Sequence, residues 1–129
     1  MYIFYNPNPD KKLVDDCLIR AICRVTGKSG DYVYTDLYAE GLEVHDWPWR
    51  NYVWGRYLNR HGFAPFIIPN SCPRCYTIRD FAEDNPNGSF ILATGNHVVA
   101  IVDGDYYDTI DSGDDVPIYV WEKGGSRWQ

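Results

Sequence analysis

Residues 95–112 read GNHVVAIVDGDYYDTIDS, and this stretch has the pattern of two β-strands joined by a tight turn. The expected strands, His97 to Val102 and Tyr106 to Ile110, are short and rich in β-branched and aromatic residues, which favour pleated, half-buried positions. Asp103-Gly104-Asp105 supplies turn residues between them. The stretch therefore predicts an antiparallel hairpin.

The length of the turn decides which residue faces His97, which follows Gly95-Asn96 at the rim of the expected sheet. A three-residue loop pairs Val102 with Tyr106 and places Asp111 directly across from His97. A two-residue loop places Ile110 opposite instead and leaves Asp111 diagonal but near. Because a carboxylate can hold an imidazole by one of its nitrogens, we expect Asp111 to orient His97.

Outside this hairpin the pattern is helical first and extended later. The first dozen residues, which contain Asn6-Pro7-Asn8-Pro9, cannot propagate a helix and should lie extended against the body. Helices are expected from Asp15 or Asp16 to a stop at Gly27, from Ser29 or Asp31 to about Glu40 with Gly41 ending it, and from Trp49 after Pro48 to about His61. Residues 77–81 predict a short capped helix that ends before the turn residues Asn85-Pro86-Asn87-Gly88. Further strands are expected at Phe63–Ile68, Phe90–Thr94 and Val116–Trp121. The fold class predicted is α+β, with N-terminal helices packed on a C-terminal antiparallel sheet.

Cys17 lies in the first turn of the first expected helix. A helix N-terminus carries partial positive charge and free N–H groups, and both favour a thiolate. The neighbouring Asp15 and Asp16 oppose this effect, so the thiolate needs a cationic partner, for which a histidine is usual. Because His45 is expected in a loop and His61 at the end of a helix, His97 is the candidate.

The order Cys17, His97, Asp111 resembles that of the papain-like cysteine peptidase superfamily, particularly its small bacterial and phage-type members. DDCLIRAI, residues 15–22, is similar to the nucleophile segment of bacteriocin-processing peptidases and of ovarian-tumour-type deubiquitinases. Residues 95–112 are similar to the family's unit of His strand, turn and Asp strand, and Asp111-Ser112 falls where papain relatives have Asn-Ser. The resemblance implies a papain-like fold and a cysteine peptidase with a catalytic triad of these three residues.

The chain departs from this family at one position. Many members bind the oxyanion with a glutamine a few residues before the cysteine, but the only glutamine here is Gln129. We therefore expect the backbone N–H of Cys17 to act with Asn6 or Asn8 from the extended arm, because two donors would stabilise the developing charge.

The remaining cysteines and the acidic hairpin offer other chemistry. Cys23 is expected in the core, and all four cysteines are expected as thiols, because a domain of this size buries a core without disulfides. Cys72-Pro73-Arg74-Cys75 has the spacing of a redox pair or of half a zinc site, but it also fits a plain turn before the Thr77 helix. Six aspartates between Asp103 and Asp115 could suggest calcium, yet solvated turns are the simpler interpretation, and no metal is expected.

Composition limits the classes of function. A length of 129 residues fits one domain, residues 1–129. The 18 acidic against 12 basic residues give a net charge of −6, the wrong sign for nucleic-acid binding through phosphates. We see no signal peptide or membrane span, so a cytoplasmic protein is expected, in the host cytoplasm if the chain is encoded by a phage.

These features favour a thiol hydrolase that cleaves an amide, peptide or isopeptide bond in a protein or peptide substrate without a cofactor. A binding or inhibitory protein of phage or mobile-element origin on the same fold is an alternative, and so is an acyltransferase or transglutaminase with the same triad. The 5 Trp, 11 Tyr and 5 Phe either form a heavily aromatic core or place some aromatic side chains at the surface for contact with a partner. The oligomeric state is not predicted.

Overall fold

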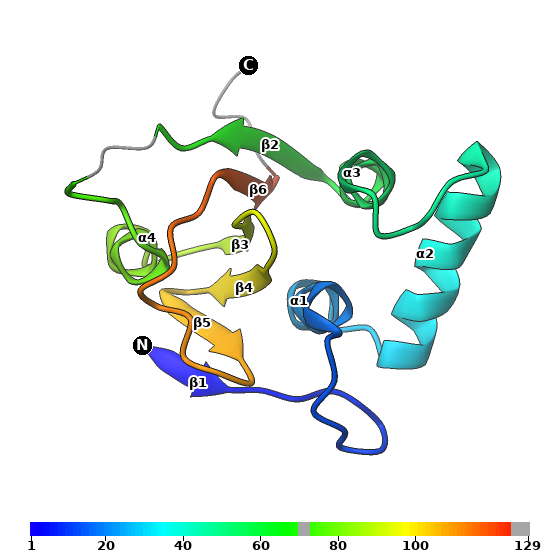
Figure 1. Ribbon diagram of the computed structural model, residues 1–129, viewed down its shortest axis with the longest axis horizontal. Coiled ribbons are helices and arrows are strands. Elements are labelled where there is room, and N and C mark those ends of the chain that lie inside the picture. Colours follow the sequence, from blue (N-terminus) through cyan, green and yellow to red (C-terminus); the bar gives the residue numbers. More distant parts are fainter. Residues whose placement is uncertain (70–72, 125–129) are drawn as a thin grey trace.

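The computed structural model describes residues 1–69 and 73–124 and has the predicted α+β class. Its helices in this range are α1 (Cys17–Thr26), α2 (Gly30–Val44), α3 (Asn51–Arg60) and α4 (Ile78–Asp84). Its strands are β1 (Tyr2–Phe4), β2 (Phe63–Ile67), β3 (Ser89–Ala93), β4 (Val98–Val102), β5 (Asp105–Asp108) and β6 (Tyr119–Lys123). Figure 1 shows α1, α2 and α3 on one side of the sheet and α4 on the other.

The strands form one sheet in the order β1-β5-β4-β3-β6-β2. Four of the pairings are antiparallel, as expected, but β1 pairs with β5 in parallel, with Tyr2 opposite Tyr106. The N-terminal arm is therefore extended as predicted over Tyr2–Phe4, where it occupies an edge of β5 that would otherwise leave backbone groups unpaired. The rest of the arm is not extended throughout, because residues 9 and 10 form a turn.

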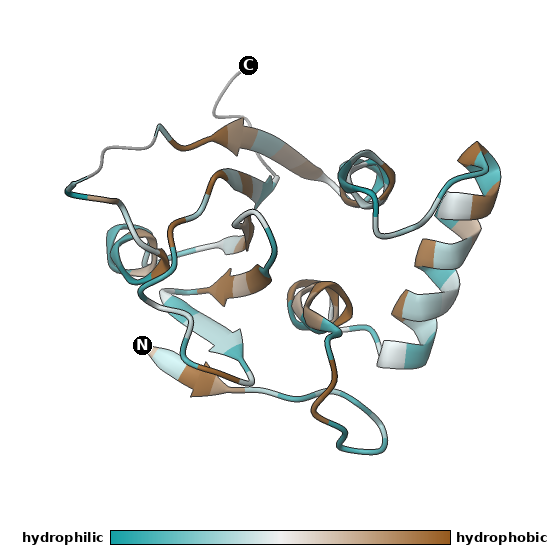
Figure 2. Cartoon of the chain, viewed as in Figure 1, coloured by the Kyte–Doolittle hydropathy of each residue, from teal (hydrophilic) through white to brown (hydrophobic). Residues whose placement is uncertain are grey.

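Each face of the sheet packs against its own apolar cluster. Because successive side chains of a strand point to opposite faces, Ile91 of β3 joins the cluster under α1, α2 and α3, whereas Phe90 and Leu92 join the cluster under α4. Figure 2 shows the hydrophobic character of α1, the helix that lies between the sheet and α2. The core therefore holds the start of α1 against the sheet that carries His97.

The bounds of α1 and α4 follow their capping residues. Gly27 ends α1 in the left-handed conformation, with φ of 74°, which glycine adopts without a Cβ penalty. Thr77 and Asp80 form a reciprocal capping box at the start of α4. Asp16 precedes α1 as predicted, but its side chain makes no capping hydrogen bond; it binds Arg20 instead.

The bounds of α2 and α3 differ from expectation. Helix α2 continues through Gly41 to Val44. A Cβ at Gly41 would lie 2.6 Å from the carbonyl oxygen of Asp46, so this glycine permits a close approach of the following loop and does not end the helix. Helix α3 begins at Asn51, after a turn that contains Pro48 and Trp49.

The β4–β5 hairpin has a two-residue turn. Val102 pairs with Asp105, and the turn residues Asp103 and Gly104 have φ of 50° and 83°. Two positive φ values are the mark of a type I′ turn, whose twist matches that of the strands it joins. Of the two loop lengths that the sequence left open, the two-residue loop is therefore the one present.

Candidate active site

Cys17 and His97 line the same cavity, which has a volume of about 210 Å³. Cys17 is a free, partly exposed cysteine at the first position of α1. The cavity is completed by Asn51 and Trp54 of α3 and by the segment from Ala93 to Val98. The fold thus brings together the cysteine and the histidine that the sequence singles out.

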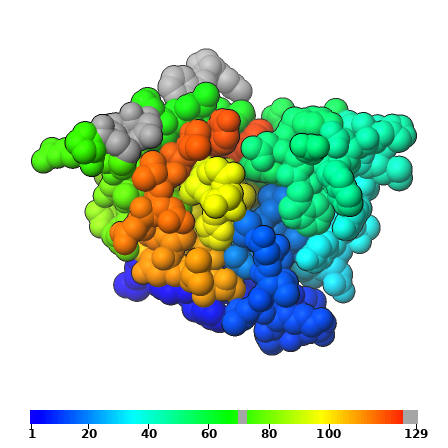
Figure 3. Space-filling model, viewed as in Figure 1, coloured from blue at the N-terminus to red at the C-terminus, as the bar shows by residue number. Residues whose placement is uncertain are grey.

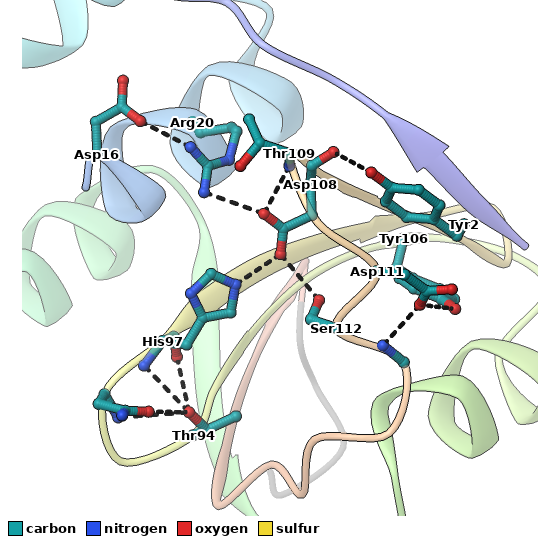
Figure 4. Close-up of polar contacts among 12 residues, drawn as sticks. Tyr2, Asp16, Arg20, Thr94, His97, Tyr106, Asp108, Thr109, Asp111 and Ser112 are labelled. Carbon is teal, nitrogen blue, oxygen red and sulfur yellow. Dashed lines mark hydrogen bonds and ion pairs between the residues drawn. The ribbon is translucent and has the colours of Figure 1, made fainter. Parts of the chain in front are cut away.

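His97 is held by the turn between β3 and β4. Its backbone N–H donates to Thr94 Oγ1 over 3.1 Å, and the Thr94 backbone N–H donates to the His97 carbonyl oxygen over 2.8 Å. Thr94 Oγ1 also contacts Asn96 Oδ1 at 3.3 Å. Figure 4 shows this group of contacts below the imidazole ring. The backbone that carries the histidine is therefore fixed by the chain on both sides.

The carboxylate that faces His97 is Asp108, with 2.6 Å between His97 Nε2 and Asp108 Oδ2. Asp111 does not contact the ring: its Oδ1 accepts hydrogen bonds from the Tyr106 hydroxyl over 2.7 Å and from the Gly113 backbone N–H over 3.0 Å. The prediction that Asp111 orients His97 is wrong in this structure.

The turn length explains the difference. Continuing the observed register places Asp108 opposite Val99, and residues two apart on a strand share a face, so Asp108 is on the face of Val99 and His97. Asp111 follows the end of β5. The signal was present in the sequence, because Asp-Gly between two apolar strands is a strong indication of a two-residue turn.

Asp108 is fully buried, and its carboxylate accepts four hydrogen bonds. Besides His97, Ser112 Oγ donates to Oδ2 over 2.9 Å. The Thr109 backbone N–H and Arg20 Nη2 donate to Oδ1 over 2.7 and 3.0 Å. These contacts (Figure 4) fix both carboxylate oxygens and with them the orientation of the imidazole.

Arg20 connects this carboxylate to the start of α1. Its Nη1 donates to Asp16 Oδ1 over 2.7 Å, and none of the side chains of Asp16, Arg20 and Asp108 is more than 5% exposed. One guanidinium thus lies between a carboxylate adjacent to Cys17 in the chain and the carboxylate that holds His97. Sequence analysis did not identify Arg20, because its second partner is 88 residues away.

The contacts of His97 favour its protonated form. Its hydrogen bond to Asp108, and next its hydrogen bond to Cys17, outweigh burial and raise the pKa of His97 to about 10. Burial raises the pKa of Asp108, but the hydrogen bond and charge of His97, with the contacts from Ser112 and Arg20, outweigh it and hold that pKa below its ordinary value. At neutral pH the pair is therefore an imidazolium beside a carboxylate.

Asn6 and Asn8 shape the N-terminal arm and do not border the cavity. Asn6 Nδ2 donates to the Lys12 carbonyl oxygen over 3.1 Å, and Asn6 Oδ1 accepts from the Asn8 backbone N–H. Asn8 Oδ1 accepts from the backbone N–H of Asp10 over 2.9 Å. The expected oxyanion role is therefore unsupported, because local turns engage these side chains. The side-chain amides that do line the cavity belong to Asn51 and Asn96.

The other cysteines differ in their environments. Cys23 lies in the core as expected, where burial first and the charge of Asp16 second raise its pKa to about 11. Cys75 is disulfide-bonded, so the expectation that all cysteines are thiols is wrong for it. Cys72 lies outside the described residues. Over residues 1–69 and 73–124, no three His, Cys, Asp or Glu side chains gather as a potential metal site.

The aromatic residues divide between core and surface. Trp54, Tyr57 and Phe63 are buried, whereas Trp47 and Tyr52 are exposed. Aromatic side chains are thus present both in the core and at the surface, and their contact with a partner stays a prediction. Among the described helices, none combines the length and the apolar character that crossing a bilayer requires.

Comparison of the chain with protein-family models, with curated proteins and with solved structures finds no match.

Proposed function

We propose that the protein is a thiol hydrolase of papain-like architecture that cleaves amide, peptide or isopeptide bonds. In this proposal Cys17 is the nucleophile, His97 is the general acid and base, and Asp108 orients His97. The supporting observation is the hydrogen-bonded series from Asp108 through His97 to Cys17 at the wall of one cavity. A nucleophile, a base and a group that orients the base are the components of covalent acyl transfer.

The first half of the reaction forms an acyl-enzyme. The Cys17 thiolate bonds to the carbonyl carbon, and the carbonyl π electrons move to its oxygen. As this tetrahedral intermediate collapses, the C–N bond breaks and the protonated His97 gives its proton to the leaving nitrogen. The products are a thioester on Cys17, a free amine and a neutral imidazole.

The second half restores the enzyme. The neutral His97 takes a proton from water while the water oxygen bonds to the thioester carbon. The C–S bond then breaks, Cys17 leaves as a thiolate, and the acid product departs. Throughout, Arg20 and Ser112 help to keep Asp108 ionised, so that it stabilises the imidazolium without taking its proton.

Two donors are available for the oxyanion. The Cys17 backbone N–H is among the first N–H groups of α1, which have no acceptor within their helix. Asn51 Oδ1 accepts a hydrogen bond from Trp54 Nε1 over 3.2 Å, which orients the side-chain amide and leaves Nδ2 as a donor. We assign Asn51 the role that sequence analysis expected of Asn6 or Asn8.

Thiol alkylation tests the proposal. At pH 7 iodoacetamide should modify Cys17 faster than Cys23, because the thiolate fraction determines the rate and Cys23 stays protonated at that pH. The variant His97→Ala should lower the rate at Cys17, whereas His61→Ala, which removes a histidine stacked on Tyr57, should leave that rate unchanged. Equal rates at Cys17 in the native protein and in His97→Ala would contradict the proposal.

Product analysis then separates hydrolysis from related chemistry. With an activated ester, a thiol hydrolase releases the free acid even when amines are added. Capture of the acyl group by an added amine would instead indicate an acyltransferase or transglutaminase. A folded protein whose Cys17 reacts no faster than Cys23 would be a binding protein and not an enzyme.

A further inference from the structure

An apolar groove lies between α3, β2 and β6, outside the catalytic cavity described above. It has a volume of about 650 Å³, within the range of sites that bind small organic groups. The apolar groove is lined by Tyr52, Trp54, Pro65, Ile67, Tyr119 and Trp121, and Asn51 and Phe66 complete its lining. Its described lining contains no Asp, Glu, Lys, Arg or His side chain.

The floor of the apolar groove is rigid. Trp54 is buried, and its ring lies 6.1 Å from that of Trp121, centroid to centroid. Gly55 permits this packing, because a Cβ there would lie 3.0 Å from Trp121 Cζ2. The rim, in contrast, is accessible: Tyr52 is 55%, Ile67 65% and Tyr119 40% exposed. Exposed apolar side chains around a formed hollow are typical of a binding site.

The apolar groove adjoins the catalytic cavity. Asn51 and Trp54 line both. Ala93 at the end of β3 lines the cavity, and its partner across the sheet is Tyr119 of the groove, at the roughly 5 Å spacing of paired residues. Figure 3 shows α3, the segment around His97 and the start of β6 meeting on one face of the molecule. When the scissile bond of a peptide lies at Cys17, the side chain of a neighbouring residue of that peptide can therefore reach the groove.

We propose that the apolar groove is a specificity subsite for one large apolar or aromatic side chain, such as Phe, next to the bond that is cleaved. This inference rests on the function proposed above and adds the substrate class. An apolar lining favours burial of an aromatic ring, and it excludes a charged side chain, which would lose its hydration without gaining a partner.

Tripeptide vinyl sulfones test the subsite, because they report side-chain selection and thiol chemistry separately. The Cys17 sulfur bonds to the vinyl carbon that is joined to the peptide, and the vinyl carbon next to the sulfonyl group takes a proton, so no group leaves. We compare Phe, Gly and Asp at each of the two residues nearest the vinyl sulfone, with mass spectrometry as the readout. At one of these residues Phe should react at least about tenfold faster than Gly, since even a methylene in an apolar pocket discriminates by that order, and Asp should react more slowly than Gly.

Variants of groove residues test whether the preference for Phe arises in the groove. Ile67→Ser and Tyr119→Ser should lower the Phe-to-Gly rate ratio several-fold while the iodoacetamide rate at Cys17 stays the same. The matched control is Leu42→Ser on α2, which also replaces an exposed apolar side chain, 72% accessible, but lies outside the groove. This control should keep the ratio.

The outcomes distinguish the two proposals. Fast iodoacetamide labelling of Cys17 with no Phe preference, or with a preference that both groove variants keep, overturns the subsite and leaves the hydrolase intact. If Cys17 is not selectively labelled, the hydrolase proposal is wrong. A titration of the Cys17→Ala variant with N-acetyl-phenylalaninamide, monitored by tryptophan fluorescence, then shows whether the groove still binds an aromatic side chain. A dimer that Ile67→Ser dissociates without a change in the ratio would make the groove an interface between copies and overturn the inference.

Discussion

At the scale of single residues, Arg20 is the residue on whose charge the site depends most. Its guanidinium lies between Asp16 and Asp108, and all three groups are buried. A buried ion pair contributes little compared with an apolar replacement of the whole group, but removal of one partner leaves an uncompensated charge in a region of low dielectric constant. The site therefore depends on Arg20 more than its distance from the reacting atoms suggests.

Replacing Arg20 with methionine should lower the free energy of unfolding by about 3–5 kcal/mol, because Asp16 and Asp108 would stay buried without their cation. Urea denaturation of both proteins at pH 7 measures the difference. Arg50→Met is the control, since Arg50 is exposed and pairs with Asp46 at 3.6 Å, and it should change stability by less than about 0.5 kcal/mol. A loss equal to that of the control would show that the buried ion pairs contribute nothing.

The two aspartates of the hairpin should differ in their effect on catalysis. Asp108→Asn should slow single-turnover acylation by an activated ester about 10²–10⁴-fold, because the amide cannot stabilise the imidazolium. Asp111→Asn should leave the rate unchanged, since Asp111 contacts Tyr106 and Gly113 and not His97. The reverse result would restore Asp111 as the orienting residue.

Sequence reasoning finds the residues whose signals are local. Cys17 is recognised by the start of its helix, and His97 by its place before an apolar strand. Asp108 could have been found only by choosing the correct turn. Arg20 could not have been found, because it resembles an exposed helical arginine until the sheet is assembled and brings Asp108 to it.

At the scale of elements, the turn between β4 and β5 determines the site. It fixes which aspartate shares a sheet face with His97, and Gly104 is the residue that makes it possible. Its φ is +83°, and an added Cβ would lie 3.3 Å from Pro86 Cα. Both the positive φ and the short distance from an added Cβ to Pro86 therefore favour glycine at this position.

Gly104→Ala should accordingly lower the free energy of unfolding by about 1–3 kcal/mol, the cost of holding a side chain in the left-handed region. Thermal denaturation compares it with Gly95→Ala, whose Cβ would meet nothing within 4 Å and whose φ is not positive. A Gly104→Ala protein as stable as the control would mean that the turn adapts and does not fix the register.

The elements also show which structural features a short stretch of sequence predicts and which it does not. The capping box at Thr77 and the glycine stop at Gly27 are contained in a few residues, and the helix ends that they mark are those predicted. The β1–β5 pairing joins residues about a hundred positions apart, so no short-range pattern announces it. Gly41 misleads for a different reason: the loop that requires a glycine there follows closely in the sequence, but it contacts Gly41 only after the chain has turned back on the end of α2.

At the scale of the whole molecule, the protonation of His97 couples the site to global stability. The pKa of His97 is raised in the folded protein to about 10, against about 6.5 in an unfolded chain. Between these values the folded state holds a proton that the unfolded state has lost. This contribution to stability is fully present below about pH 6.5 and is lost as the pH rises toward 10.

The free energy of unfolding should therefore fall from pH 6.5 to pH 9.5, by at most about 1.4 kcal/mol per pH unit. Urea denaturation is done with Cys17 in place, because its hydrogen bond contributes to the raised pKa of His97. Adding His97→Asn should flatten the decline, and the difference between the two proteins isolates the histidine from other groups. Parallel curves would show that His97 keeps an ordinary pKa in the fold.

The arrangement of the chain around the sheet also has a consequence for biosynthesis. Cys17 belongs to the first helix, whereas His97 and Asp108 belong to β4 and β5. A ribosome therefore makes the thiol early and the groups beside it late. Until β4 and β5 have been synthesised, the growing polypeptide carries Cys17 without these partners, so a nascent chain cannot perform the proposed chemistry before this part of its sheet is made.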